Sequence, residues 1–325
     1  MPIFFRIFLP FFLLFSASCS TIPYSSVHKS LTPPDYLVDQ YTPDQAWIAE
    51  SREEIARGVW RVTFVPETPE DTSLPIIADY FPASPYLPAP GILVSPILGG
   101  KNRVADHFAR YFADRGYHCI VVHRPEDLKK KVQSPEQLEY LMKQAVIRDR
   151  VVLDWFVRQP GVIDRALGSF GISYGGIKNT ILAGVDQRLK VNTIALAGAD
   201  IPSIIASSTL EELHRLRTSS MESNGQTLAE LENSIRISQM TEPLRFAPYI
   251  NPETTFLILA RMDTTVPRKN GELLRQALGY PRTLYLPTGH YSGVFFTGML
   301  FYPYIESKTL AFFNKHLLPL MESGS

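Results

Sequence analysis

Cysteine is scarce in this chain of 325 residues, which contains only Cys19 and Cys119. Two cysteines exclude a disulfide framework, and their positions do not form a metal-ligand pair. Cys119 lies inside an apolar run at residues 118–122 and is predicted to be a buried strand residue. There is no excess of charge either: 32 basic residues balance 32 acidic ones, so electrostatics give no reason to expect nucleic acid as a partner. An apolar content of 45% is typical of a globular protein.

Long hydrophobic runs are also missing, apart from residues 7–15 near the start. This run is interrupted by Pro10 and is too short to span a bilayer as a helix of about 20 residues. It follows the lone charge of Arg6 and precedes the small residues 16–18, so residues 1–18 are interpreted as a secretory signal.

Cys19 follows these small residues directly, and the segment resembles a bacterial lipobox, in which the cysteine is lipidated. The resemblance implies an envelope protein held on a membrane through Cys19, and Ser20 fits the periplasmic face of the outer membrane if the source is Gram-negative. Ser16 departs from the usual leucine. Ordinary cleavage after residue 18, giving a secreted or periplasmic protein, and a retained anchor therefore remain alternatives. Residues 19–57 are expected to form a tether and an N-terminal extension.

From about residue 58, strand-like and helix-like segments alternate. Such an order predicts an α/β fold with a mostly parallel, doubly wound sheet. Two early strands are expected to pair as an antiparallel hairpin at its edge. The domain is predicted to cover residues 58–318, with a small helical cap inserted at about residues 200–248. The expected strands are 60–64, 75–81, 91–94, 118–122, 167–172, 191–197, 255–260 and 283–286, with helices at 104–112, 135–156, 177–185 and 306–318.

Ser173 stands between two glycines, Gly171 and Gly175, where a strand-like run gives way to a helix-like one. Only small residues fit such a sharp turn, which raises the serine hydroxyl above the sheet. The pattern by itself is weak, and a glycine-rich turn with a surface serine is the alternative. The flanking elements favour a nucleophile.

Asp263 and His290 each follow a later strand, and the carboxyl ends of parallel strands meet at one edge of the sheet. A serine hydroxyl needs an imidazole to take its proton and a carboxylate to orient that imidazole. We therefore predict a triad of Ser173, Asp263 and His290. Asp263 could instead be a turn residue, with Asp200 as the acid. His123 ends a strand at the same edge and could line the pocket.

An oxyanion formed on the substrate requires two backbone N–H groups. One is expected from Tyr174, directly after the serine. The second is expected from the loop at residues 95–100, with Ile97 as the first choice and Leu98 as the second. A plain strand-to-helix loop is the alternative.

Residues 171–176, 242–250 and 263–267 resemble segments of the dienelactone hydrolase, acetyl xylan esterase and prolyl-oligopeptidase-like branches of the α/β-hydrolase superfamily. The resemblance covers about residues 58–318. It implies a serine hydrolase that cleaves small acyl esters through an acyl-enzyme, with no metal or organic cofactor. Two features depart from those branches: Ser95 and Pro96 replace the usual His-Gly, and Arg261 stands where glycine is common. A related peptidase and a non-catalytic lipoprotein module remain alternatives.

Overall fold

The computed structural model describes residues 19–25, 30–68, 74–83, 88–98, 102–124 and 134–322. The predicted signal at residues 1–18 lies outside them, as do His28, Gly99 and Gly100. Within the described ranges, no helix combines the length and apolar character needed to cross a membrane.

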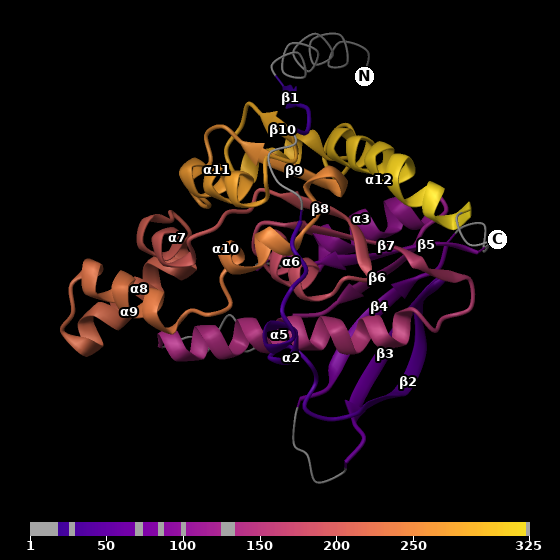
Figure 1. Cartoon of the computed structure of the whole chain (residues 1–325), viewed down its shortest axis with the longest axis horizontal. Coiled ribbons are helices and arrows are strands. Elements are labelled where there is room, and N and C mark those ends of the chain that lie inside the picture. The colour runs from indigo at the N-terminus through magenta and orange to yellow at the C-terminus, as the bar shows by residue number, and fades with distance from the viewer. Residues whose placement is uncertain are drawn as a thin grey trace.

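A single sheet of ten strands forms the centre of the molecule, and the strand order is β1-β10-β9-β8-β7-β5-β6-β4-β3-β2 (Figure 1). Six neighbouring strands run parallel: β5 (Ala89–Ser95), β6 (His118–Val122), β7 (Val162–Ile172), β8 (Leu189–Ala195), β9 (Thr255–Ala260) and β10 (Arg282–Leu286). Antiparallel strands extend one edge: β4 (Ile76–Phe81), β3 (Val59–Pro66) and β2 (Trp47–Ala56). The predicted α/β class and the antiparallel hairpin are confirmed.

Helices cover both faces of the sheet, as the connections between parallel strands require (Figure 1). One face packs against α5 (Pro135–Phe156), α6 (Tyr174–Val185) and α11 (Arg268–Ala277). The other packs against α3 (Arg103–Ala113) and α12 (Tyr304–Glu322). The start of α5 follows the predicted signals, because Ser134 accepts a hydrogen bond from the Gln137 N–H and Pro135 is the first helical residue.

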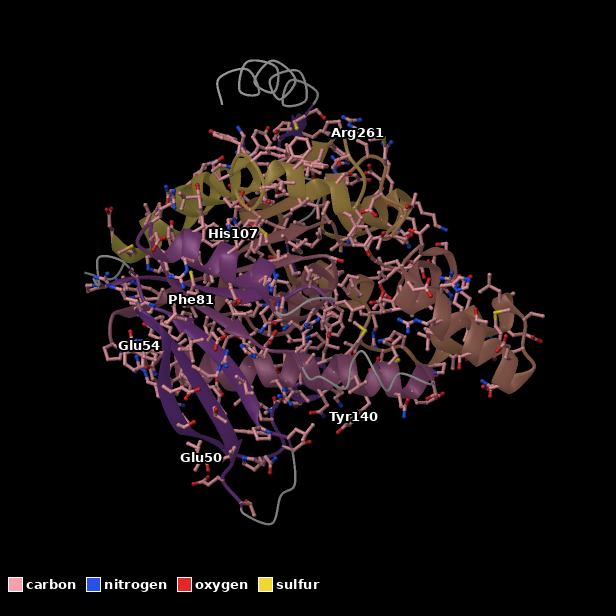
Figure 2. The ribbon with its side chains drawn as sticks, turned by 180° about the vertical axis from the view of Figure 1, so that it is seen from behind. Glu50, Glu54, Phe81, His107, Tyr140 and Arg261 are labelled. Atoms are coloured by element: carbon pink, nitrogen blue, oxygen red, sulfur yellow. The ribbon has the colours of Figure 1, made fainter. Side chains whose placement is uncertain are left out.

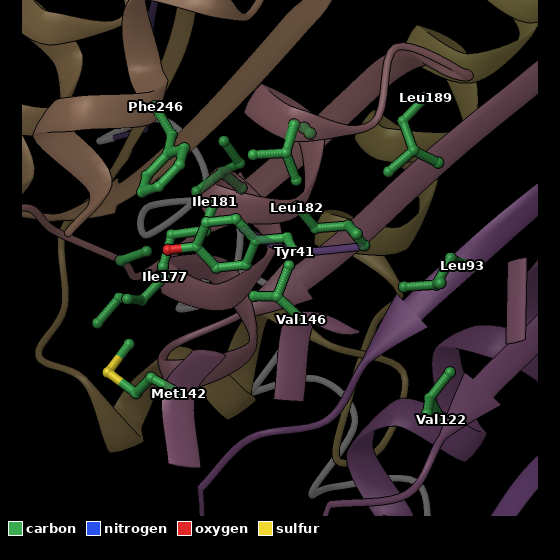
Figure 3. Close-up of a cluster of buried hydrophobic side chains, with 14 of the residues drawn as sticks. Tyr41, Leu93, Val122, Met142, Val146, Ile177, Ile181, Leu182, Leu189 and Phe246 are labelled. Carbon is green, nitrogen blue, oxygen red and sulfur yellow. The ribbon is translucent and has the colours of Figure 1, made fainter. Parts of the chain in front are cut away.

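The described part of residues 19–57 packs into the domain, which corrects the expected tether and the boundary at residue 58. β1 (Ser20–Ile22) pairs with β10, and β2 forms the opposite edge. Tyr41, which follows α2 (Asp35–Asp39), is buried with its ring edge-on to Phe246 (Figure 3). Its hydroxyl lies 2.8 Å from the Thr241 hydroxyl oxygen. β2 was not predicted because nearly all of its side chains are exposed and four of the ten are charged, as suits an edge strand.

The insertion between β8 and β9 is helical, as predicted. It contains α7 (Ile201–Ser207), α8 (Glu211–Asn224), α9 (Leu228–Ser238), α10 (Pro243–Phe246) and the short 3-10 turns η1 (Ala247–Tyr249) and η2 (Pro252–Thr254). On α9, Leu231 and Ile235 are buried in the main core, whereas Leu228 is 40% exposed. The apolar stripe of α9 therefore packs mainly onto the domain instead of facing a pocket.

A buried ion pair joins α5 to α6, the helix that begins directly after Ser173. Lys178 Nζ lies 2.8 Å from Asp149 Oδ1 and 2.7 Å from Oδ2, and both side chains are buried. Burial raises the pKa of Asp149, and the charge and hydrogen bond of Lys178 act against that shift. Each of these two buried charges therefore neutralises the other, close to the turn that carries Ser173.

We expect Lys178→Met to destabilise the fold by about 3–5 kcal/mol, because it leaves the Asp149 carboxylate buried without its partner. The double variant Lys178→Met/Asp149→Leu should recover most of this loss, since no charge then remains in the core. Denaturant unfolding of the two variants and the wild type measures both effects. A single variant as stable as the wild type would contradict this account of the pair.

Candidate active site

Ser173 occupies the turn between β7 and α6 with a backbone that non-glycine residues rarely adopt, at φ 58° and ψ −125°. Its N–H donates to the Ala195 carbonyl oxygen at 2.8 Å. A Cβ on Gly171 would lie 2.3 Å from the Gly175 carbonyl oxygen, and one on Gly175 would lie 2.4 Å from that of Ser95. Any side chain at either position would collide with backbone. The two glycines of the motif are thus explained by close packing around a raised serine.

The structure brings the three predicted triad side chains together. His290 Nε2 lies 2.9 Å from Ser173 Oγ, and His290 Nδ1 lies 2.7 Å from Asp263 Oδ2. The second oxygen of Asp263 accepts the N–H groups of Thr265 and Val266, both at 2.9 Å. The side chains of His290 and Asp263 are only 8% and 4% exposed. A carboxylate fixed in this way can hold the imidazole in one orientation, with the other ring nitrogen toward the serine.

The rival acid, Asp200, has other partners. Its carboxylate caps α7 by accepting the Ser203 N–H at 3.4 Å, and it pairs with Arg236 Nη1 at 2.9 Å. Within the described part of the chain, Asp200 makes no hydrogen bond or ion pair with His290. The geometry therefore favours Asp263 as the partner of the imidazole.

The other described histidines have contacts of their own. His123 Nε2 lies 2.7 Å from Asp79, a carboxylate that also accepts two hydrogen bonds from Arg61, and His123 is not among the residues that line the cavity described below. Burial tends to raise the pKa of Asp79, but the hydrogen bonds from His123 and Arg61 outweigh it and lower this pKa. The remaining described histidines are His107, bonded to Glu306, His118, bonded to Tyr80, His214 on α8 and His316, packed on Phe312.

The residues predicted to hold an oxyanion lie around the serine. Tyr174 is the first residue of α6, so its N–H has no partner within the helix. The elbow touches the loop after β5, since a Cβ on Gly175 would also lie 2.8 Å from the Pro96 carbonyl oxygen. Leu98 lines the same cavity as Ser173 and Tyr174, whereas Ile97 does not, which favours the second choice for the loop donor. Arg124 donates to the Leu98 carbonyl oxygen and so holds this loop, a contact that the sequence did not reveal.

A cavity of about 270 Å³ opens beside Ser173. Its wall is mostly aliphatic and comes largely from four helices: α5, the start of α6, α7 and α8. Leu210, Leu213 and Leu216, spaced by three residues around the start of α8, all line it. The contributions of α5 and α7 were not predicted, because nothing in their local sequence shows which turn of a helix reaches the site. These residues are Leu138, Met142, Ile201, Ile204 and Ile205.

Within the described part of the chain, no three His, Cys, Asp or Glu side chains are grouped so that they could hold a metal ion.

No family model matches the sequence, and a search of curated proteins gives no match either. Solved structures do match. An acetyl xylan esterase from Paenibacillus sp. R4 aligns over 87% of this chain and 92% of its own, with 16% identity and a TM-score of 0.59. Acetyl xylan esterase 1 from Thermoanaerobacterium sp. JW/SL YS485 aligns over 84% and 96%, with 12% identity and a TM-score of 0.59. The acylaminoacyl peptidase of Pyrococcus horikoshii aligns over 89% of this chain but only 44% of its own, with 16% identity and a TM-score of 0.57.

These likenesses, together with the strand order and the position of Ser173 after β7, show that the chain has the α/β-hydrolase fold, as the sequence predicted.

We expect Asp263→Asn to slow the reaction of Ser173 with a fluorophosphonate probe strongly, on the order of 10⁴-fold if it follows the corresponding change in serine proteases. An amide in place of the carboxylate holds the wrong imidazole tautomer and does not stabilise the imidazolium. Asp200→Asn is the matched control and should have a mild effect, because it alters a helix cap. The reverse ranking would make Asp200 the acid of the site.

Proposed function

We propose that this protein is a serine esterase that cleaves carboxylic esters through an acyl-enzyme intermediate. The observation that carries the proposal is the chain of contacts Ser173–His290–Asp263, in which one imidazole bonds to both a hydroxyl and a buried carboxylate. A serine hydroxyl is a weak nucleophile at neutral pH, and this arrangement is the one that activates it.

In the first step, Ser173 Oγ attacks the ester carbonyl carbon while His290 Nε2 takes the hydroxyl proton. Asp263 stabilises the imidazolium that forms. The carbonyl oxygen becomes an oxyanion, which accepts hydrogen bonds from the Tyr174 N–H and from an N–H of the loop at Leu98 or Ile97 in this proposal. One such donor typically contributes about 3–4 kcal/mol. The intermediate then expels the alcohol, which takes the proton from His290.

In the second step, water attacks the acyl-serine. His290 takes a proton from the water, the same N–H groups bind the new oxyanion, and collapse of the intermediate releases the acid. The proton returns to Ser173 Oγ. The site thus ends in its starting state, with one ester and one water converted to an acid and an alcohol.

The aliphatic cavity supports an acyl chain as the part of the substrate that enters the protein. Most of its lining residues are aliphatic and come from the cap, α5 and α6, and Glu212, Arg215 and Ser219 of α8 are polar members of the lining. Neighbours named as esterases support ester substrates, and the neighbour named as a peptidase keeps peptide cleavage as the second candidate. Attachment to the bacterial envelope through Cys19 stays a prediction from the sequence.

Ser173→Ala should abolish both ester hydrolysis and fluorophosphonate labelling while leaving the unfolding midpoint nearly unchanged, because this residue is present for its hydroxyl and not for packing. Assays on nitrophenyl esters of graded acyl length and on peptide anilides measure the activity and rank the two candidates. Ser234→Ala on α9 serves as the control. A protein that is never labelled is a non-catalytic module, and labelling that persists in Ser173→Ala places the nucleophile elsewhere.

Leu213→Phe should move the preferred ester toward shorter acyl chains by filling part of the cavity. Each methylene that no longer fits loses about 0.8 kcal/mol, or roughly fourfold in kcat/KM, so two methylenes correspond to about fifteenfold. Leu228→Phe on α9 is the matched control, since Leu228 is exposed and outside the cavity lining. An unchanged chain-length profile for Leu213→Phe would show that the acyl group binds elsewhere.

A further inference from the structure

An unusual number of large apolar side chains are exposed directly after His290. Seven of the twelve residues at positions 291–302 are exposed apolar or aromatic residues, and Met262, beside Asp263, is 63% exposed. Isolated exposed hydrophobic residues are common, but a concentration of them marks an interaction surface. We call this surface the apolar rim; it consists of Met262, Tyr291, Val294, Phe295, Met299, Leu300, Phe301 and Tyr302.

The rim is part of an ordered structure. Phe295 and Phe301 stack with their ring centroids 5.6 Å apart. Hydrogen bonds fix the backbone between these two residues. The Gly298 N–H donates to Glu306 Oε1 at 2.8 Å. The Leu300 and Phe301 N–H groups both donate to the Thr297 carbonyl oxygen. Glu306 is itself buried and bonded to His107 at 2.6 Å. A fixed backbone thus presents these apolar side chains to the outside.

Cys19 lies at the same edge of the molecule. β1 is antiparallel to β10, with Ser20 opposite Tyr285 and Ile22 opposite Thr283. The chain therefore enters β1 at the carboxyl end of β10, the end from which His290 also follows. Cys19 packs against α12 near Tyr304, only two residues after the rim ends.

Arg261 lies between the start of β1 and the apolar rim. Its guanidinium Nη2 donates to Ser20 Oγ at 2.6 Å, and the next residue is Met262 of the rim. Figure 2 shows Arg261 at one end of the molecule, far from Tyr140 and Glu50 near the other. Arg261 and Lys308 both lie close enough to Cys19 to influence its thiol electrostatically. Two cations beside an apolar surface suit a layer of phosphate headgroups over acyl chains.

We propose that the apolar rim binds the surface of a lipid bilayer and so turns the active-site edge toward the membrane. The occupant is inferred from the chain itself, because Cys19, the predicted site of lipid attachment, lies at this edge. Partial insertion of aromatic side chains at the headgroup level is favourable because it buries apolar area. The binding does not require the chemistry proposed for Ser173.

The test uses the predicted mature chain, residues 19–325, with Cys19→Ala in every variant so that neither an acyl chain nor the apolar run at residues 7–15 contributes. Phe295→Ser/Phe301→Ser removes two rim side chains that are 47% and 51% exposed, whereas the control Tyr36→Ser/Tyr140→Ser removes two aromatic side chains that are 64% and 61% exposed on α2 and α5. Flotation with vesicles of equal parts phosphatidylcholine and phosphatidylglycerol gives the partition coefficient. We expect the rim variant to lose about tenfold or more and the control to remain unchanged.

A second measurement locates the contact directly. Phe295→Trp should be quenched by vesicles that contain brominated phosphatidylcholine, beyond the signal from the native tryptophans in the parent chain. Equal partitioning of the rim variant and the control overturns the proposal, as does an absence of added quenching. A rim variant that loses self-association in ultracentrifugation, with unchanged vesicle binding, assigns the surface to a second copy instead.

The same variants separate this proposal from the proposed reaction. Phe295→Ser/Phe301→Ser should hydrolyse a water-soluble nitrophenyl ester at the wild-type rate, because neither side chain contacts the triad. Ser173→Ala should bind vesicles like the parent chain. If none of these proteins, the parent chain included, hydrolyses the soluble ester, the proposed esterase activity is contradicted. The proposed binding of the apolar rim to lipid is not affected by that result.

Discussion

The backbone of Ser173 is the constraint on which the rest of the site depends. A non-glycine residue at φ 58° and ψ −125° costs on the order of 1–3 kcal/mol, so its surroundings must enforce it. The Ser173 N–H bonds to β8, and Gly175 packs on the backbone of the loop after β5. A Cβ on Gly176 would lie 2.8 Å from the Cβ of Ala197. This close packing holds the start of α6 against the ends of β5 and β8 at once, which places the Ser173 hydroxyl and the Tyr174 N–H beside the cavity.

The cap is held over this point by carboxylates more than by a core of its own. Glu139 on α5 accepts the N–H groups of Met240 and Thr241 at 2.9 and 2.8 Å, and Glu242 accepts those of Asp200 and Ile201, both at 2.8 Å. Burial raises the pKa of Glu242, and the backbone N–H groups act against that shift. Both ends of the α7–α9 segment are therefore fixed, while the cavity wall between them is free to differ in side-chain size without disturbing the triad.

Local sequence predicted those features whose causes are local. The parallel strands are continuous apolar runs, and the turn at Ser173 needs glycines for steric reasons, so both were readable. β2 was missed because an edge strand with charged side chains lacks the alternation that marks a half-buried one. The burial of Tyr41 and the contact of Arg124 with Leu98 were missed because their partners lie 200 and 26 residues away, respectively. The choice between Asp200 and Asp263 likewise needed coordinates, since both follow strands.

Residues of the apolar rim directly neighbour Asp263 and His290 in the chain, and Ser173 is among the residues that line the aliphatic cavity. Tyr291 belongs to the rim, follows His290 directly and is 67% exposed. Partial burial raises the pKa of Tyr291, and the nearby charges of Glu212 and Asp263 raise it further. Exposed apolar area is costly in water, at roughly 25 cal/mol per Å², and that cost falls where the surface meets lipid. An ester that partitions into a bilayer would approach from that phase and pass its acyl chain to aliphatic walls. The same hydrophobic effect that folds the domain would then also select the substrate.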